Sequence, residues 1–408
     1  MNTLAADADT HRPVPTFLTH GFRPFFLAAG LWSASALLLW IVMFTTGSTI
    51  PSRFDPLAWH IHEMLFGFVM AAVAGFLLTA IPNWTGRQPV SGAPLTLLAG
   101  LWLLGRISCL ISALLPPWLA IVADLSFPLV LAGVVAREIV AGRNYRNLPM
   151  TAAVTGLAIA NLLMHLEAAG VPLPAGLGWR LGLAAVIVLI SVVAGRIVPS
   201  FTRNWLAKRR DIDLPVGNEW IDRAALSILH VGLFSWALFP AFRAVGALLL
   251  LGAAFNLWRL LRWHGSATVA EPLLLILHIG YAWLVLGATL LGLALFNLNV
   301  PQSAAIHALT AGAIGTMILA VMTRVTRGHT GRALSGRSRH GRDLPPGQHR
   351  RDHPGRRCCR RSLDNAAACR LGNPVDWRLR AVRLALRTDA ASSRKSQIAR
   401  LSSRPSDR

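Results

Sequence analysis

The sequence has few charged residues: Asp, Glu, Lys and Arg make up 14% of its 408 residues, whereas soluble domains contain roughly 25%. This deficit excludes an ordinary soluble domain and predicts a polytopic membrane protein. Cysteine is also scarce. Of the four cysteines, only Cys109 lies in the apolar part of the chain, so we expect neither a disulfide framework nor a CxxC metal site.

Lysine and glutamate are almost missing from one basic segment. Residues 331–408 contain 19 Arg, one Lys, six Asp and no Glu, a net charge of +14 out of the total of +22. Because most of the positive charge lies there, it gives no reason to expect a specific nucleic-acid partner. We interpret residues 334–408 as a disordered tail that is translated in a shifted reading frame of a GC-rich gene. The alternative is a genuine basic tail that binds anionic lipid or nucleic acid.

Long apolar runs, in contrast, are abundant. Ten of them are long enough to cross a hydrocarbon core of about 30 Å at about 1.5 Å per helical residue. We therefore expect an all-α, polytopic transmembrane helical bundle over residues 21–333, after a polar segment at residues 1–20. The predicted spans are residues 24–46, 58–81, 95–115, 118–136, 149–170, 179–199, 221–241, 244–262, 271–296 and 301–323.

The basic residues predict the orientation of these spans. If the N-terminus is cytoplasmic, the outer loops contain only Arg53, Arg180 and Arg243. The inner loops and ends then hold most of the others: Arg12, Arg23, Arg87, Arg137, Arg143, Arg146, Arg203, Lys208, Arg209, Arg210, Arg259, Arg262, Arg324 and Arg327. The positive-inside rule thus predicts a cytoplasmic N-terminus. Because the first 20 residues are polar, we expect no cleavable signal peptide.

Histidines in or beside the apolar runs are the best indication of function. An imidazole that faces lipid is costly, so intramembrane histidines face the protein interior, a cavity or a cofactor. Neutral imidazole is also a common ligand of haem iron, copper and zinc. The seven candidates are His20, His60, His62, His165, His230, His278 and His307.

Two of these histidines open the second predicted span. His60 and His62 are two positions apart, about 200° around a helix, so they bind one metal ion only if the helix begins between them. Glu63 follows directly, and its carboxylate is placed to accept a hydrogen bond from an imidazole and so orient the ring toward a metal ion. The segment is not the HExxH zinc motif, whose histidines are four positions apart. The alternative for each histidine is a side chain at the interface that contacts water.

The other histidines divide by depth. By topology, His165 and His307 lie toward the outer face with His60 and His62, whereas His20 lies at the inner surface. His230 and His278 lie nearer the middle and the inner half of the bundle. For these two, the alternative to a metal ligand is a buried imidazole that is hydrogen-bonded to a neighbouring helix. Cys109 is more typical of a core residue than of a ligand.

Several separated motifs resemble the NnrS family in the same order. They are His20–Phe26 (HGFRPFF), His60–Gly67 (HIHEMLFG), Leu78–Gly86 (LTAIPNWTG), Pro199–Asn204 (PSFTRN), Met322–Val325 (MTRV) and Gly328–Arg332 (GHTGR). The likeness covers residues 15–333. It implies a bacterial inner-membrane protein with about twelve spans, of which this chain shows ten.

The resemblance also implies function: haem and copper as cofactors, and a part in the nitric oxide stress response and in denitrification. We predict His62, His230, His278 and His307 as haem or copper ligands, with His60, His165 and His20 as second choices. The alternative is a multi-span transporter or proton carrier that uses its intramembrane histidines. The sequence leaves open the haem type, catalytic turnover, the redox partner, and whether nitric oxide is a substrate or a signal.

Overall fold

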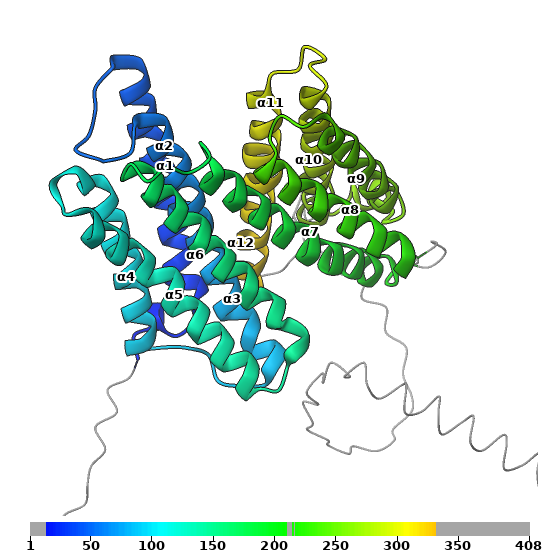
Figure 1. The fold of residues 1–408 in the computed structure, drawn as a ribbon. Helices are drawn as coiled ribbons and strands as arrows, with labels where there is room; N and C mark the ends of the chain where they lie inside the picture. The colour runs from blue at the N-terminus through cyan, green and yellow to red at the C-terminus, as the bar shows by residue number, and fades with distance from the viewer. Residues whose placement is uncertain (1–13, 210–213, 216, 332–408) are drawn as a thin grey trace, which may run out of the picture. The chain divides into compact units, whose positions relative to one another are not determined.

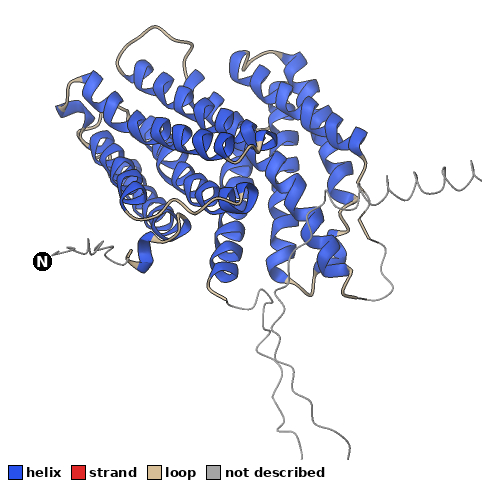
Figure 2. Ribbon diagram, turned by 90° about the horizontal axis from the view of Figure 1, so that it is seen from below, coloured by secondary structure: helices blue, strands red, loops and turns tan. Residues whose placement is uncertain are grey.

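The computed structural model describes residues 14–209, 214, 215 and 217–331, all of which belong to one compact unit. These residues form helices joined by loops, and the described part contains no strand (Figure 2). The predicted all-α fold is therefore confirmed. The predicted tail at residues 334–408 lies outside the described residues, as do residues 1–13 of the predicted N-terminal segment.

Twelve α-helices make up most of the described chain. They are α1 (Phe22–Thr46), α2 (Pro56–His62), α3 (Met70–Thr85), α4 (Ala93–Leu110), α5 (Pro117–Ala141), α6 (Leu148–Ala168), α7 (Leu177–Leu206), α8 (Glu219–Leu238), α9 (Arg243–Leu261), α10 (Pro272–Leu295), α11 (Gln302–His307) and α12 (Thr316–His329). Four short 3₁₀ turns connect them: η1 (Thr16–Leu18), η3 (Ser112–Leu114), η4 (Tyr145–Asn147) and η5 (Gly265–Thr268).

Two π-helical segments join pairs of these helices into longer ones. The segment η2 (Glu63–Val69) links α2 to α3, and η6 (Ala308–Gly315) links α11 to α12. A π-helical turn is rare and is frequent at functional sites, because it changes the direction of the side chains that follow it. Each of the two segments begins directly after a histidine, His62 or His307.

Ten of the resulting helices are long and apolar enough to cross a membrane, which confirms the predicted number of spans. The second, Pro56–Thr85, is 78% buried over its most apolar window, whereas the other nine range from 22% to 56%. The second span is therefore the central helix of its part of the bundle. Any polar group on its buried face needs a partner from a neighbouring helix.

The helices pack mainly with their neighbours in sequence (Figure 1). In the first half, α4 packs on α5, α5 on α6 and α1 on α3; in the second half, α8 packs on α9, and α9 and η6 pack on α10. The 30-residue helix α7 contacts α6, α8 and α10. The beginning and end of the described chain also meet, because α1 and α3 both contact α12.

Small residues allow the close contact between α1 and α3. A Cβ atom at Gly75 would overlap the ring of Phe26 on α1 and would lie 3.2 Å from the Cβ atom of Phe25. At the start of α1, the backbone amide of Phe22 donates a hydrogen bond to Thr79 Oγ1 over 3.2 Å. Because lipid gives no hydrophobic driving force for helix association, this steric fit and this hydrogen bond hold α1 in place.

We predict that Gly75→Leu destabilises the bundle by about 1–3 kcal/mol, because the new side chain must displace the ring of Phe26. Thermal unfolding of the purified protein in detergent measures the effect. Gly30→Leu is the matched control, since a Cβ atom at Gly30 on α1 meets no atom within 4 Å. Equal unfolding temperatures for the two variants would contradict this packing.

Candidate metal centre

Three charged side chains form a buried ion network in the first half of the bundle. Arg106 on α4 donates through Nη1 to Glu63 Oε2 over 2.6 Å, and through Nη2 to Asp124 Oδ1 on α5. Trp32 Nε1 on α1 donates to the same Glu63 oxygen over 2.7 Å. The side chains of all three charged residues are at most 2% exposed. Charges in such a place are tolerated only when they are paired and hydrogen-bonded.

The imidazole of His62 lies between the two carboxylates. Its Nδ1 atom is 3.0 Å from Glu63 Oε1, and its Nε2 atom is 2.8 Å from Asn161 Oδ1 and 3.2 Å from Asp124 Oδ2. Asn161 Nδ2 on α6 donates to Asp124 Oδ2 over 2.8 Å. Two carboxylates and one guanidinium leave a net charge of −1, so one further positive charge beside His62 neutralises the group.

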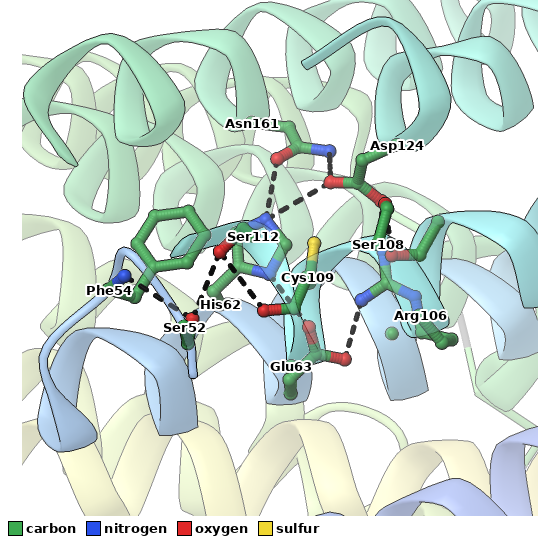
Figure 3. Close-up of polar contacts among 12 residues, drawn as sticks. Ser52, Phe54, His62, Glu63, Arg106, Ser108, Cys109, Ser112, Asp124 and Asn161 are labelled. Carbon is green, nitrogen blue, oxygen red and sulfur yellow. Dashed lines mark hydrogen bonds and ion pairs between the residues drawn. The ribbon is translucent and has the colours of Figure 1, made fainter. Parts of the chain in front are cut away.

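Four potential metal ligands meet at this point. One ligand atom from each of His62, Cys109, Asp124 and His165 lies within 4.8 Å of the others, and all four residues are buried. Figure 3 shows the Cys109 sulfur directed toward His62 and Asp124. His165 Nε2 is 3.0 Å from Asp124 Oδ2, and its ring centroid is 5.2 Å from that of His62. A set of imidazole, thiol and carboxylate groups suits a transition-metal ion.

Glycines bring the helices close enough to build this cluster. A Cβ atom at Gly105 would overlap Asp124, and one at Gly67 would overlap Trp32 and the Glu63 carboxylate. The Gly67 carbonyl accepts a hydrogen bond of 3.0 Å from Trp102 Nε1. That bond satisfies a backbone oxygen within the π-helical segment η2, where regular helical hydrogen bonding is disturbed.

His60 and His307 lie apart from this cluster and near each other. His60 stacks on Trp40, with ring centroids 4.3 Å apart, and it is close enough to His307 for their charges to interact. The Nδ1 atom of His60 is buried and has no hydrogen-bond partner among the described residues. His307 Nδ1 bonds to the Ser303 carbonyl over 2.8 Å. The helices α2 and α11 thus each offer an imidazole nitrogen to a ligand near His60 and His307.

At the other end of the tenth span, a further pair of imidazoles is found. His20 and His329 have ring centroids 5.9 Å apart, and the ring of Phe22 contacts both. His20 lies outside the spans, where burial, together with the charges of His329 and Arg23, lowers its pKa. A lowered pKa favours the neutral imidazole, which is the form that binds metals.

His230 and His278 each bond to a hydroxyl group on α7. His230 Nε2 is 2.8 Å from Ser191 Oγ, and His278 Nε2 is 3.3 Å from Thr202 Oγ1. His278 Nδ1 also lies 3.1 Å from the Leu274 carbonyl. These contacts match the alternative of interhelical hydrogen bonds, and the role of either residue as a ligand stays a prediction.

The sequence analysis did not single out Arg106, Asp124 or Asn161 as site residues, and it treated Cys109 as core. A signal for the two charged residues was present, since Arg106 and Asp124 lie inside predicted spans at 95–115 and 118–136. Charges in such positions mark functional sites as clearly as histidines do. For Asn161 and Cys109 no such signal existed, because their partners come from other helices.

Comparison with models of known families identifies a match over most of the chain. The family model described as NnrS protein matches residues 16–340, which is most of the chain. The match agrees with the likeness of the motifs from His20 to Arg332. Neither the curated proteins nor the solved structures contain a match to the chain.

We predict that Arg106→Met lowers the stability of the protein by about 3–5 kcal/mol, because it leaves two buried carboxylates uncompensated. Thermal unfolding in detergent measures the loss. Arg137→Met is the control: this arginine is 65% exposed and pairs with Glu138, so its loss should cost about 0–1 kcal/mol. A small and equal change in both variants would mean that the ion network does not stabilise the bundle.

Proposed function

Because this chain belongs to the NnrS family, we propose that it is a haem- and copper-binding protein of the bacterial inner membrane. Its role is in the nitric oxide stress response and in denitrification, and its N-terminus is cytoplasmic. The observation that supports a metal centre is the buried group of His62, Cys109, Asp124 and His165. Haem iron and copper both bind nitric oxide and exchange single electrons, which is the chemistry that these cofactors supply.

The buried group suits copper(I) by its ligands. Soft thiolate and imidazole ligands favour copper(I) or zinc over hard cations such as Mg²⁺ and Ca²⁺. With Cys109 bound as the thiolate, the charges of Glu63, Asp124, Cys109 and Arg106 sum to −2, so a metal cation at this point reduces the negative charge of the group, and copper(I) leaves −1. Glu63 holds the Nδ1 atom of His62, and Nε2 would face the ion in place of its contact with Asn161 Oδ1.

Haem requires a site other than the cluster of His62, Cys109, Asp124 and His165. The four ligand atoms lie within 4.8 Å of one another, so no macrocycle fits between His62 and its neighbours. We place one haem at His60 and His307, two residues that the sequence analysis predicted as ligands. The support is the buried, unpartnered Nδ1 of His60 and the nearness of His307, with Trp40 stacked on the His60 ring.

One observation favours a second function, a proton carrier. Both ring nitrogens of His62 face oxygen atoms, an arrangement in which a proton instead of a metal ion neutralises the group. His62 between Glu63 and Asp124 would then bind and release a proton within the membrane. The two functions differ in metal content, since a proton carrier is purified without copper and without colour.

We predict that the purified wild-type protein contains copper, and that Cys109→Ser, His62→Gln and His165→Gln each reduce its copper content at least tenfold. Loss of one ligand from a four-ligand site weakens binding, and these substitutions roughly keep side-chain size. Elemental analysis of the detergent-purified protein measures the copper-to-protein ratio. Ser108→Ala is the control, because Ser108 is buried beside Cys109 and its hydroxyl donates to the Gly105 carbonyl of its own helix. A wild-type protein without copper would contradict the copper site and favour the function of a proton carrier.

We also predict that His60→Ala and His307→Ala each abolish the spectrum of the haem at this site, because each would remove one imidazole that holds the iron. The optical spectrum and the haem-to-protein ratio measure the loss. In parallel, His230→Ala and His278→Ala test the two predicted ligands that bond to hydroxyl groups instead. If those two variants lose haem and the first two keep it, our placement of the haem is wrong.

A further inference from the structure

The loop between the first two spans, residues 47–55, passes over the candidate metal centre. The ring of Phe54 stacks on the His62 imidazole, with centroids 4.7 Å apart and an interplanar angle of 28°, and its centroid is 5.1 Å from that of His165. Figure 3 shows this ring beside His62. Phe54 is only 6% exposed, although the next residue of the loop, Asp55, is exposed. One aromatic side chain of a surface loop therefore covers two of the four candidate ligands.

The loop is fastened to the turn that follows the helix of Cys109. The Arg53 amide donates a hydrogen bond to Ser112 Oγ over 2.8 Å, and Arg53 Nη2 donates to the Leu115 carbonyl over 2.9 Å. Ser112 Oγ in turn donates to the Cys109 carbonyl over 3.2 Å. Such hydrogen bonds contribute little net free energy, because water replaces them when the partners separate. The loop is thus held in place by contacts that break without a large cost.

Both ends of the loop are points about which it can turn. Gly47 follows α1 with a φ angle of +70°, in the left-handed region, and a Cβ atom there meets no atom within 4 Å. At the other end, Asp55 caps α2, since its Oδ1 atom accepts hydrogen bonds of 3.0 Å from the amides of Leu57 and Ala58. Lids turn about a few residues at the ends of such elements. The geometry allows the loop to lift Phe54 while α1 and α2 stay in place.

A second aromatic ring contacts His62 from the interior of the bundle. Phe66 lies one turn deeper along the second span, and its ring centroid is 5.2 Å from that of His62. It packs toward α7, where a Cβ atom at Gly182 would lie 3.1 Å from it. Displacement of Phe66 would connect the ligands only with the bundle interior. Displacement of Phe54, which belongs to a surface loop, would connect them with water.

We propose that Phe54 is the gate of an entrance through which a soft metal ion passes between water and the group of His62, Cys109, Asp124 and His165. Thiol and imidazole groups recognise this class of ion. With a cytoplasmic N-terminus, the loop faces the outer side of the membrane, so the ion arrives from there. The closed ring also excludes water, which strengthens the charge interactions within the group. The proposal rests on the proposed function, in that the buried group holds a metal ion.

The first test is the rate at which a charged, membrane-impermeant methanethiosulfonate labels Cys109 in the metal-free protein in detergent. Cys358, Cys359 and Cys369 are replaced by serine in all variants, so that Cys109 is the only thiol of the chain. We expect Phe54→Ala to raise the labelling rate by a factor of about ten or more, because the reagent then reaches the buried thiol from water. Intact-mass spectrometry over time measures the rate.

Phe66→Ala is the matched control, since it also removes an aromatic ring from His62, but from the interior side. Its labelling rate should stay at that of the wild type. Equal acceleration in Phe66→Ala and Phe54→Ala would mean general loosening of the bundle and would overturn the gate. No acceleration in Phe54→Ala would overturn it as well.

A second variant guards against misfolding of Phe54→Ala. Arg53→Met keeps the ring and removes two hydrogen bonds from the guanidinium to backbone carbonyls. It should speed the labelling of Cys109 by a smaller factor than Phe54→Ala, because the loop lifts more often. The wild-type rate in Arg53→Met would contradict a gate that opens with the loop.

The side of the entrance is tested by labelling Phe54→Ala in its membrane. We expect the reagent to label Cys109 in right-side-out spheroplasts and to leave it unlabelled in sealed inside-out vesicles. The reverse result would place the entrance on the cytoplasmic side and overturn a route from the outer side.

Copper release separates this inference from the proposed function. Bathocuproine disulfonate, a water-soluble chelator of copper(I), should remove copper faster from Phe54→Ala than from the wild type or Phe66→Ala. If the wild type holds no copper and the labelling of Cys109 still depends on Phe54, the copper site is wrong and the entrance stands. If copper is bound and neither rate depends on Phe54, the entrance is wrong and the copper site stands.

Discussion

The buried ion network of Glu63, Arg106 and Asp124 imposes the strongest constraint on this molecule. Two carboxylates in the interior of an apolar bundle require compensation, and a single guanidinium supplies only half of it. His62 lies where the remaining charge is needed, with an oxygen partner on each ring nitrogen. Much of the local structure serves this arrangement. Gly67 and Gly105 let the helices approach, and the π-helical segment begins at Glu63 itself.

A second organising feature is the contact between the first and the last described spans. Because α12 packs on α1 and α3, histidines far apart in the sequence come into pairs at both ends of the tenth span. The proposed copper ligands lie on α2, α4, α5 and α6, and the proposed haem ligands His60 and His307 lie on the second and tenth spans.

The sequence was sufficient for the number of spans, because long apolar runs predict transmembrane helices without knowledge of the tertiary structure. It also placed His62 and His165 at a similar depth, and the structure brings their rings into contact. The sequence could not predict which residues of different helices contact one another. His62 and Asn161 are 99 positions apart, and whether they meet depends on the rotation of α6 against the second span. The contacts of Cys109 also could not be predicted, because its neighbours in the sequence are typical of a core residue. His60 and His62 diverge because α2 already begins at Pro56, before both of them.

X-ray absorption at the copper edge of the purified protein tests most directly whether one metal ion lies within the buried network. We predict one copper(I) ion with one sulfur ligand and at least one imidazole nitrogen, and we expect Cys109→Ser to remove the sulfur signal. Copper with nitrogen and oxygen ligands alone, unchanged by Cys109→Ser, would contradict the placement of the ion among His62, Cys109, Asp124 and His165.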